Sequence, residues 1–257
     1  MSHGVPIVCV RSDKSSGLGI GTTPSAFMAH GIDTTIVELD PVVHQLATTH
    51  FDLPTNHTAY LMDAVIFLQR ELDSPQPKQY DYIIHDVFTG GAEPTTLFTY
   101  EFLSGLKQLL KPEGTIAINY ASDIGLPSTK YVINTIISVF SNCRLFRDVA
   151  EEDGAMHVNF VNMVLFCRQT DHPLMFREPV EADYLGTSSR KTYLLPRLEM
   201  DLEQYVMRDD KRMLTANKTM ILHAAKTFEM DRWHNVAARR HWEVMRTVIP
   251  PQVWELW

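Results

Sequence analysis

Short apolar runs alternate with longer segments of helical period over the first 170 residues of the chain. The short runs are rich in β-branched residues, as buried strands are, and the longer segments repeat apolar side chains every three or four positions. Strands are predicted at residues 5–10, 34–39, 58–62, 80–85 and 115–120, and helices at residues 24–30, 41–51, 64–72, 97–110 and 128–140. This alternation is typical of an α/β fold, a parallel sheet with helices on both faces.

Two further runs, at residues 144–150 and 162–168, predict an antiparallel pair that closes a seven-stranded, Rossmann-like sheet of methyltransferase type. A turn is predicted at residues 111–114, where Pro and Gly follow each other closely. Beyond residue 170, patterns of helical period run from about 189 to 207 and from about 216 to 248. We therefore expect a nucleoside-binding domain at 1–170 and a C-terminal helical extension at 171–257, packed over the sheet edge or against a partner such as a second copy in a homodimer.

The charge of the chain argues against a nucleic-acid partner. The formal net charge is -8 over 257 residues, and Lys and Arg do not cluster as phosphate binding requires. A cationic or neutral substrate fits this balance better. No apolar run reaches the roughly 18 residues that span a bilayer, and the first residues lack the pattern of a signal peptide. The sequence thus predicts a cytoplasmic protein without membrane contact.

The cysteines and histidines do not predict a metal site. Cys9, Cys143 and Cys167 are far apart, without the paired spacing of a disulfide framework or a zinc site. We expect all three to be reduced core residues. The histidines of the extension also lack the spacing of metal ligands.

A glycine-rich segment follows the first predicted strand and precedes the first helix. Gly17, Gly19 and Gly21 would let the backbone approach a ligand closely, and a helix amino terminus offers free N–H groups to it. Such a segment alone is equally consistent with a surface turn. An acidic residue 17 positions after Gly21 favours the ligand-binding interpretation.

That residue is Glu38, at the end of the second strand, where a carboxylate accepts hydrogen bonds from the ribose hydroxyls of a nucleoside. The alternative is a solvated or helix-capping acid, although Asp40 suits the cap better. Asp63 and Ala64 follow the third strand, where the carboxylate would meet the adenine amine and the neighbouring N–H a ring nitrogen. Capping of the next helix would also explain Asp63.

Asp86 closes the fourth strand beside the point where open α/β sheets bind ligands. It is the candidate for contact with the cofactor and for orienting or deprotonating a nucleophile, the alternative being that it only orders the next loop. Glu93 in the loop at 88–93 is a second candidate carboxylate. Tyr120, at the end of the fifth strand, and this loop are expected to shape the acceptor pocket.

Together, the glycine segment, residues 36–41, Asp63 with Ala64, residues 80–86 and residues 109–120 resemble the spermidine/spermine synthase family, including its spermidine-synthase-like protein methyltransferases. The resemblance covers residues 17–122 and is nearest to fungal members. It implies that Glu38 holds the ribose and Asp63 the adenine of S-adenosylmethionine or decarboxylated S-adenosylmethionine. It also implies that Asp86 activates an attacking amine.

The chain departs from the family in three places. Aminopropyltransferases have a second aspartate three residues after the first, and this chain has Thr89 there. The family's β-rich amino-terminal segment, which covers the site, is not expected here, and residues 11–16 separate the first strand from the glycine segment.

These departures favour one transferase reaction over another. The leading hypothesis is an enzyme that transfers a methyl group from S-adenosylmethionine to a small-molecule or protein nucleophile. An amine is one candidate for the small molecule. The alternatives are a polyamine aminopropyltransferase and a catalytically idle or cofactor-independent member of the fold.

Overall fold

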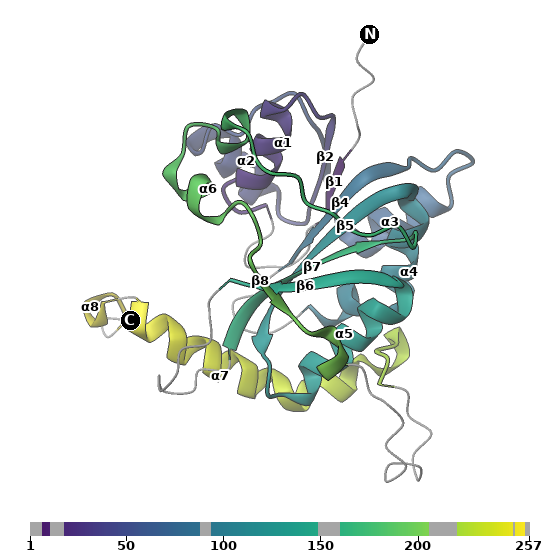
Figure 1. The fold of residues 1–257 in the computed structure, drawn as a ribbon, viewed down its shortest axis with the longest axis vertical. Coiled ribbons are helices and arrows are strands. Elements are labelled where there is room, and N and C mark those ends of the chain that lie inside the picture. The colour runs from purple at the N-terminus through teal and green to yellow at the C-terminus, as the bar shows by residue number, and fades with distance from the viewer. Residues whose placement is uncertain are drawn as a thin grey trace.

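The computed structural model describes residues 7–10, 18–87, 94–148, 160–205, 220–248 and 250–254. Its strands are β1 (Ile7–Val10), β2 (Thr34–Glu38), β3 (Thr58–Leu61), β4 (Tyr80–Asp86), β5 (Leu110–Asp123), β6 (Asn142–Arg147), β7 (Phe160–Arg168) and β8 (Leu198–Met200). Within the described residues they form one eight-stranded sheet in the order β3-β2-β1-β4-β5-β7-β6-β8 (Figure 1). Neighbours from β3 to β5 are parallel, and β7, β6 and β8 continue the sheet in antiparallel pairs.

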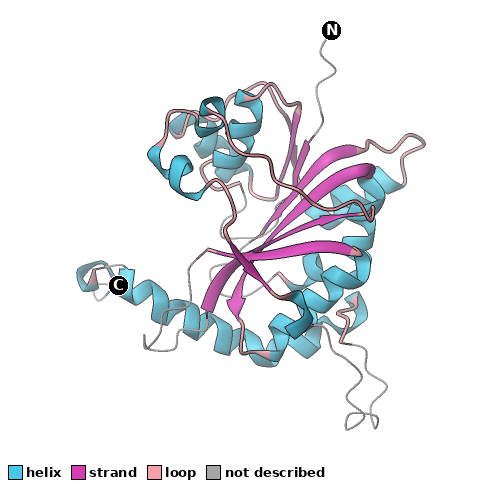
Figure 2. Cartoon of the chain, in the orientation of Figure 1, coloured by secondary structure: helices cyan, strands magenta, loops and turns pink. Residues whose placement is uncertain are grey.

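Helices cover both faces of this sheet (Figure 2). The α-helices are α1 (Thr22–Ala29), α2 (Pro41–His50), α3 (Ala64–Leu72), α4 (Tyr100–Leu109), α5 (Pro127–Val139), α6 (Ser188–Tyr193), α7 (Asp231–Val248) and α8 (Pro251–Trp254). Short 3-10 helices are η1 (Thr95–Phe98), η2 (Glu181–Tyr184), η3 (Leu202–Gln204) and η4 (Ala224–Met230). The predicted α/β class with helices on both faces is confirmed, and the sheet has eight strands where seven were predicted, because β8 of the C-terminal extension joins it.

Two apolar clusters lie on opposite faces of the sheet. The larger cluster joins β4, β5 and β7 to α3, α4 and α5, and the smaller one lies under α1 and α2. The strand β2 shows the division, because Ile36 belongs to the smaller cluster and the next residue, Val37, to the larger one. We call the side of the larger cluster the core face and the other side the second face.

The turn predicted at residues 111–114 is instead part of a strand. Between two pairings, β4 advances from Tyr80 to Tyr82 while β5 advances from Leu110 to Thr115. The extra residues form a bulge, which accommodates Pro and Gly inside a strand without ending it. The predicted turn is therefore wrong, because Pro112 and Gly114 lie inside β5.

The extension after residue 170 is not purely helical. The helix predicted from 189 to 207 is wrong, because α6 ends at Tyr193 and β8 follows as an edge strand of the sheet. Antiparallel pairing with β6 places Glu199 opposite Phe146, and Arg144 on β6 binds the Glu199 carboxylate with 2.7 Å contacts from two nitrogens. These contacts join residues far apart in sequence, so the helical period of this segment did not reveal them.

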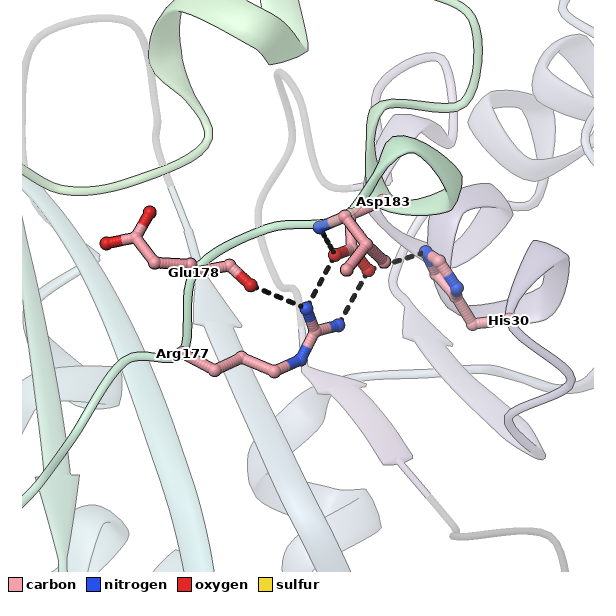
Figure 3. A network of polar contacts seen from close by, with 5 residues as sticks. His30, Arg177, Glu178 and Asp183 are labelled. Atoms are coloured by element: carbon pink, nitrogen blue, oxygen red, sulfur yellow. Dashed lines mark hydrogen bonds and ion pairs between the residues drawn. The ribbon is translucent and has the colours of Figure 1, made fainter.

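The segment between β7 and α6 crosses in front of the sheet and reaches α1 (Figure 1). Figure 3 shows the contacts at its far end: Arg177 donates to both carboxylate oxygens of Asp183, at 2.6 and 2.7 Å, and His30 lies 4.0 Å from the same carboxylate. The Arg177 guanidinium holds the pKa of the Asp183 carboxyl well below its usual range, so the pair is charged at neutral pH. His30 follows α1, and this network therefore brings the extension to the first helix.

The helix α7 lies at the carboxyl end of β5. Arg240 pairs with Asp123, the last residue of β5, whose side chain is fully buried. Nearby, the rings of His241 and Phe160 are 5.2 Å apart. The extension thus contributes both an edge strand and a helix at the strand ends. The boundary at residue 170, directly after β7, stays a prediction.

Cys143 and Cys167 form a disulfide, which corrects the expectation that these cysteines are reduced. The two residues lie directly opposite each other on β6 and β7, a register that spacing along the chain does not reveal. Because disulfides persist mainly in oxidising compartments, the cysteines no longer support the predicted cytoplasmic location. Of the helices that the structure describes, none combines the length and apolarity needed to cross a bilayer.

Candidate functional site

The carboxyl ends of β2 and β4 lie on either side of β1 at the same level. Val10, at the end of β1, pairs with Val37 of β2 and with His85 of β4. Glu38 and Asp86 are the next residues on those two strands, so both lie at the same sheet edge. The strand order reverses between β1 and β4, and ligands of open α/β sheets bind beside such a reversal. The structure therefore brings these two predicted site residues together.

The glycine segment is held in a left-handed backbone conformation next to this edge. Gly19 has φ 56° and Gly21 has φ 80°, values that side chains disfavour. A Cβ on Gly21 would also lie 2.8 Å from Cδ1 of Leu53. Glycine is therefore favoured at both places in the turn into α1. Gly17 lies outside the described residues.

Glu38 anchors this segment. Its side chain is fully buried, and the backbone N–H groups of Leu18 and Asp40 donate to its two carboxylate oxygens, the second at 2.9 Å. The predicted cap of α2 is Asp40, which accepts from the N–H of Val42 at 2.8 Å. A carboxylate oxygen has room for a second donor, so the anchoring contact is compatible with a ribose hydroxyl. Ribose binding by Glu38 stays a prediction.

Asp63 caps α3 through one of its two carboxylate oxygens. Oδ1 accepts from the N–H groups of Val65 and Ile66, at 2.7 and 3.4 Å, while Oδ2 has no partner among the described residues. The N–H of Ala64, in the first turn, has no acceptor within the helix. This set fits an adenine edge, which offers one amine donor and one ring acceptor. The capping role is confirmed, and the adenine role stays a prediction.

Asp86 is held by a residue that the sequence did not suggest. Asn119 is its direct partner on β5, and the Asn119 amide nitrogen donates to Oδ1 of Asp86 at 2.9 Å. Among the residues that the structure describes, the buried amide oxygen of Asn119 has no hydrogen-bond partner. A buried acceptor costs free energy unless it meets a donor, so this oxygen marks a place for one. The only signal in the sequence is a polar residue inside an apolar strand.

Tyr120 lies on the other face of β5 from Asn119. Its side chain is 1% exposed, and its ring packs against that of Phe98 at 5.3 Å, within the core-face cluster. Alternation along the strand therefore separates Tyr120 from the Asp86 side of the sheet. The structure gives this residue a packing role, and its part in an acceptor pocket stays a prediction. Glu93 and the loop at 88–93 lie outside the described residues.

His85 is a structural residue at the end of β4. It is fully buried, its Nε2 lies 3.0 Å from the carbonyl oxygen of Leu97, and its ring lies edge-on to that of Phe98. Burial lowers the pKa of His85 to about 4, so the imidazole is neutral at physiological pH. The side chain faces the core, away from Asp86. No group of three or more metal-ligating side chains occurs within the described residues.

Comparison with solved structures identifies the architecture. Human methyltransferase-like protein 13 in complex with SAH has a TM-score of 0.53 at 22% identity, over 82% of this chain and 88% of that one. A probable spermidine synthase from Corynebacterium glutamicum has a TM-score of 0.56 at 22% identity, over 79% of this chain and 68% of that one. The chain has the methyltransferase fold. The predicted likeness to spermidine synthases holds at the level of this fold.

Sequence comparison extends the likeness along the whole chain. The N-terminal histidine N-methyltransferase of Emericella nidulans is 50% identical over 262 residues, which is 100% of this chain and 46% of that protein. A polyamine aminopropyltransferase of Vibrio vulnificus is 36% identical over 107 residues, 40% of this chain and 35% of that protein. The chain thus spans about half of the first relative and a third of the second. No family model matches it.

Proposed function

We propose that this protein transfers a methyl group from S-adenosylmethionine to a nitrogen of the N-terminal histidine of a polypeptide. One observation carries the proposal, the 50% identity along the full chain to an N-terminal histidine N-methyltransferase. The described site supports it, because two acidic residues flank the end of β1 and a third follows β3.

The cofactor would lie over the ends of β1, β2 and β3. Glu38 would hold the ribose hydroxyls, the free oxygen of Asp63 the adenine amine, and the N–H of Ala64 a ring nitrogen. Gly19 and Gly21 let the backbone pass close to the nucleoside. S-adenosylmethionine supplies an activated methyl group on its sulfonium, so the protein contributes mainly by positioning the two reactants.

Asp86 would receive the acceptor on the β5 side of the same edge. Its carboxylate is oriented by the Asn119 amide, and it would accept a hydrogen bond from an N–H of the histidine. That contact fixes which nitrogen keeps its lone pair for the methyl group, and it stabilises the positive charge that develops on the residue. In this proposal the acceptor is a polypeptide rather than a free small molecule.

Aminopropyl transfer is the less favoured reaction. The likeness to an aminopropyltransferase covers 40% of the chain, against the whole chain for the methyltransferase. The second aspartate of the aminopropyltransferases is replaced by Thr89, so one of two carboxylates that suit a diamine is missing. A catalytically idle protein would bind neither cofactor.

The test is to incubate the protein with S-adenosylmethionine and a peptide that begins with histidine, and to analyse the products by mass spectrometry. We expect a gain of one methyl group on the first residue and release of S-adenosylhomocysteine. The matched peptide begins with alanine and should gain nothing. Methylthioadenosine from decarboxylated S-adenosylmethionine and putrescine would support aminopropyl transfer instead, and no binding of either cofactor would support the idle alternative.

A further inference from the structure

A cavity of about 420 Å³ lies between the outer strands of the sheet and the segment that leads into β8. Its floor consists of Phe146 on β6 and of Val164 and Phe166 on β7. Residues 192–198 form its opposite wall. The volume is within the range of pockets that hold small ligands or side chains, about 300 to 1,000 Å³.

The floor of this cavity lies in one row with Asp86. Across neighbouring strands, Asp86 pairs with Asn119, Asn119 with Val164, and Val164 with Phe146. Residues that are directly opposite one another in a sheet point to the same face. The row therefore runs along the second face from the candidate acceptor carboxylate, past the unsatisfied amide oxygen of Asn119, into the cavity.

The spacing of the row suits an extended polypeptide. Strands lie about 4.8 Å apart, so Val164 is about 10 Å from Asp86 and Phe146 about 14 Å. An extended chain advances about 3.3 Å per residue, so a polypeptide whose first residue lies at Asp86 reaches the cavity with its fourth and fifth residues. A molecule of the size of a free amino acid would not span this distance.

The lining of the cavity suits one apolar side chain with backbone around it. The three floor side chains are apolar, as are Leu194, Leu195 and Pro196 on the opposite wall. Polar groups that can bond peptide N–H and carbonyl groups come from Asn162, Asp148 and Arg197. This is the usual composition of a specificity pocket, an apolar interior with a few polar groups that fix orientation.

We infer that this cavity binds the acceptor polypeptide and takes an apolar side chain from its fourth or fifth residue. The inference rests on the proposed function for the identity of the acceptor. It adds a site that determines which polypeptides are methylated, on β6, β7 and the 192–198 segment. The cofactor residues on β2 and β3 take no part in it.

The test measures binding and turnover separately, with fluorescein-labelled peptides. One hexapeptide begins with histidine and has phenylalanine at position four, a second has alanine there, and a third is a histidyl-alanine dipeptide. We expect the first to bind about tenfold more tightly than the second, the gain from burying one large apolar side chain. Anisotropy gives the affinities without requiring methyl transfer.

Two variants locate the effect. Val164→Phe fills the floor, and Leu195→Lys places a charge in the opposite wall without changing a strand. Each should weaken binding of the phenylalanine peptide about tenfold and leave KM for the dipeptide and the affinity for S-adenosylhomocysteine unchanged. Val253→Phe is the matched control, since Val253 is 54% exposed on α8, and it should bind every peptide as the unmodified protein does.

The outcomes separate the two proposals. Peptide binding that depends on Val164, without methyl transfer, would keep the cavity and reject the proposed function. Methyl transfer with equal affinity for the phenylalanine and alanine peptides would keep the function and overturn the cavity. An equal loss of dipeptide and hexapeptide turnover in both variants, or no peptide binding at all, would also overturn it.

Discussion

On the β1–β3 side of the sheet, the candidate cofactor groups lie where successive strands end. The glycine segment lies between β1 and α1, Glu38 ends β2, and Asp63 caps α3 after β3. On the β5–β6 side, the groups that would receive the acceptor come from Asp86, from β5 to β7 and from residues 192–198. The first set is held by local contacts, such as the cap that Asp63 forms on α3. The second set is assembled by the pairing of strands that are far apart along the chain.

This difference explains why the residues of the first side can be identified from the sequence more easily than those of the second. A local cap or a tight turn imposes a residue type at a fixed distance, and it therefore leaves a signature in the sequence. Cross-strand neighbours need only fit each other, and many residue pairs do so. The candidate cofactor side can therefore be recognised from the sequence, whereas the candidate acceptor side cannot.

The largest effect should follow Asp86→Asn. Asparagine keeps the shape of the side chain and removes the charge that holds the acceptor, so turnover should fall about a hundredfold or more. Affinity for S-adenosylhomocysteine should change less than about twofold, because in the proposed arrangement the cofactor would lie mainly on the other side of β1. Steady-state kinetics and calorimetry measure the two quantities.

The matched control for this change is Asp81→Asn. Asp81 is on the same strand but toward its other end, where Lys111 binds it at 2.6 Å. Its loss should leave turnover nearly unchanged. Equal losses of turnover and cofactor affinity in Asp86→Asn would contradict the division of the site into two sides.

A smaller effect should follow Glu38→Gln, and it should fall on cofactor affinity instead of turnover. Glutamine removes the charge of the acceptor that would hold the ribose hydroxyls, and a hydrogen bond to a charged group contributes about 1.5–3 kcal/mol. Cofactor affinity should therefore fall about tenfold or more, while turnover at saturating cofactor stays within a fewfold. Asp40→Asn, which preserves the cap of α2, is the control. A loss of turnover without a loss of cofactor affinity would contradict the assignment of Glu38 to the cofactor side.

The sequence predicted the elements whose signals are local. The ends of β2 and β4 were predicted to within one residue, because runs of apolar β-branched residues stop there. The caps at Asp40 and Asp63 were also identified, because capping residues stand at a fixed place before the helix. These positions fix the sheet edge and most of the candidate cofactor site.

The sequence could not predict what depends on register. The strand β8 is three residues long within a segment of helical period, and only its pairing with β6 makes it a strand. The Cys143–Cys167 bond and the contact of Asn119 with Asp86 likewise require the order of strands to be known first. The same holds for the cavity beside Val164, whose lining spans residues 146–198.

The most direct measurement is a crystal structure of the protein with S-adenosylhomocysteine and the phenylalanine hexapeptide. We predict the adenine amine at Asp63, the ribose hydroxyls at Glu38, the first residue of the peptide at Asp86 and its phenylalanine on Val164. A nucleoside bound away from the ends of β2 and β3, or a peptide that lies off the second face of β5 and β7, would contradict this account.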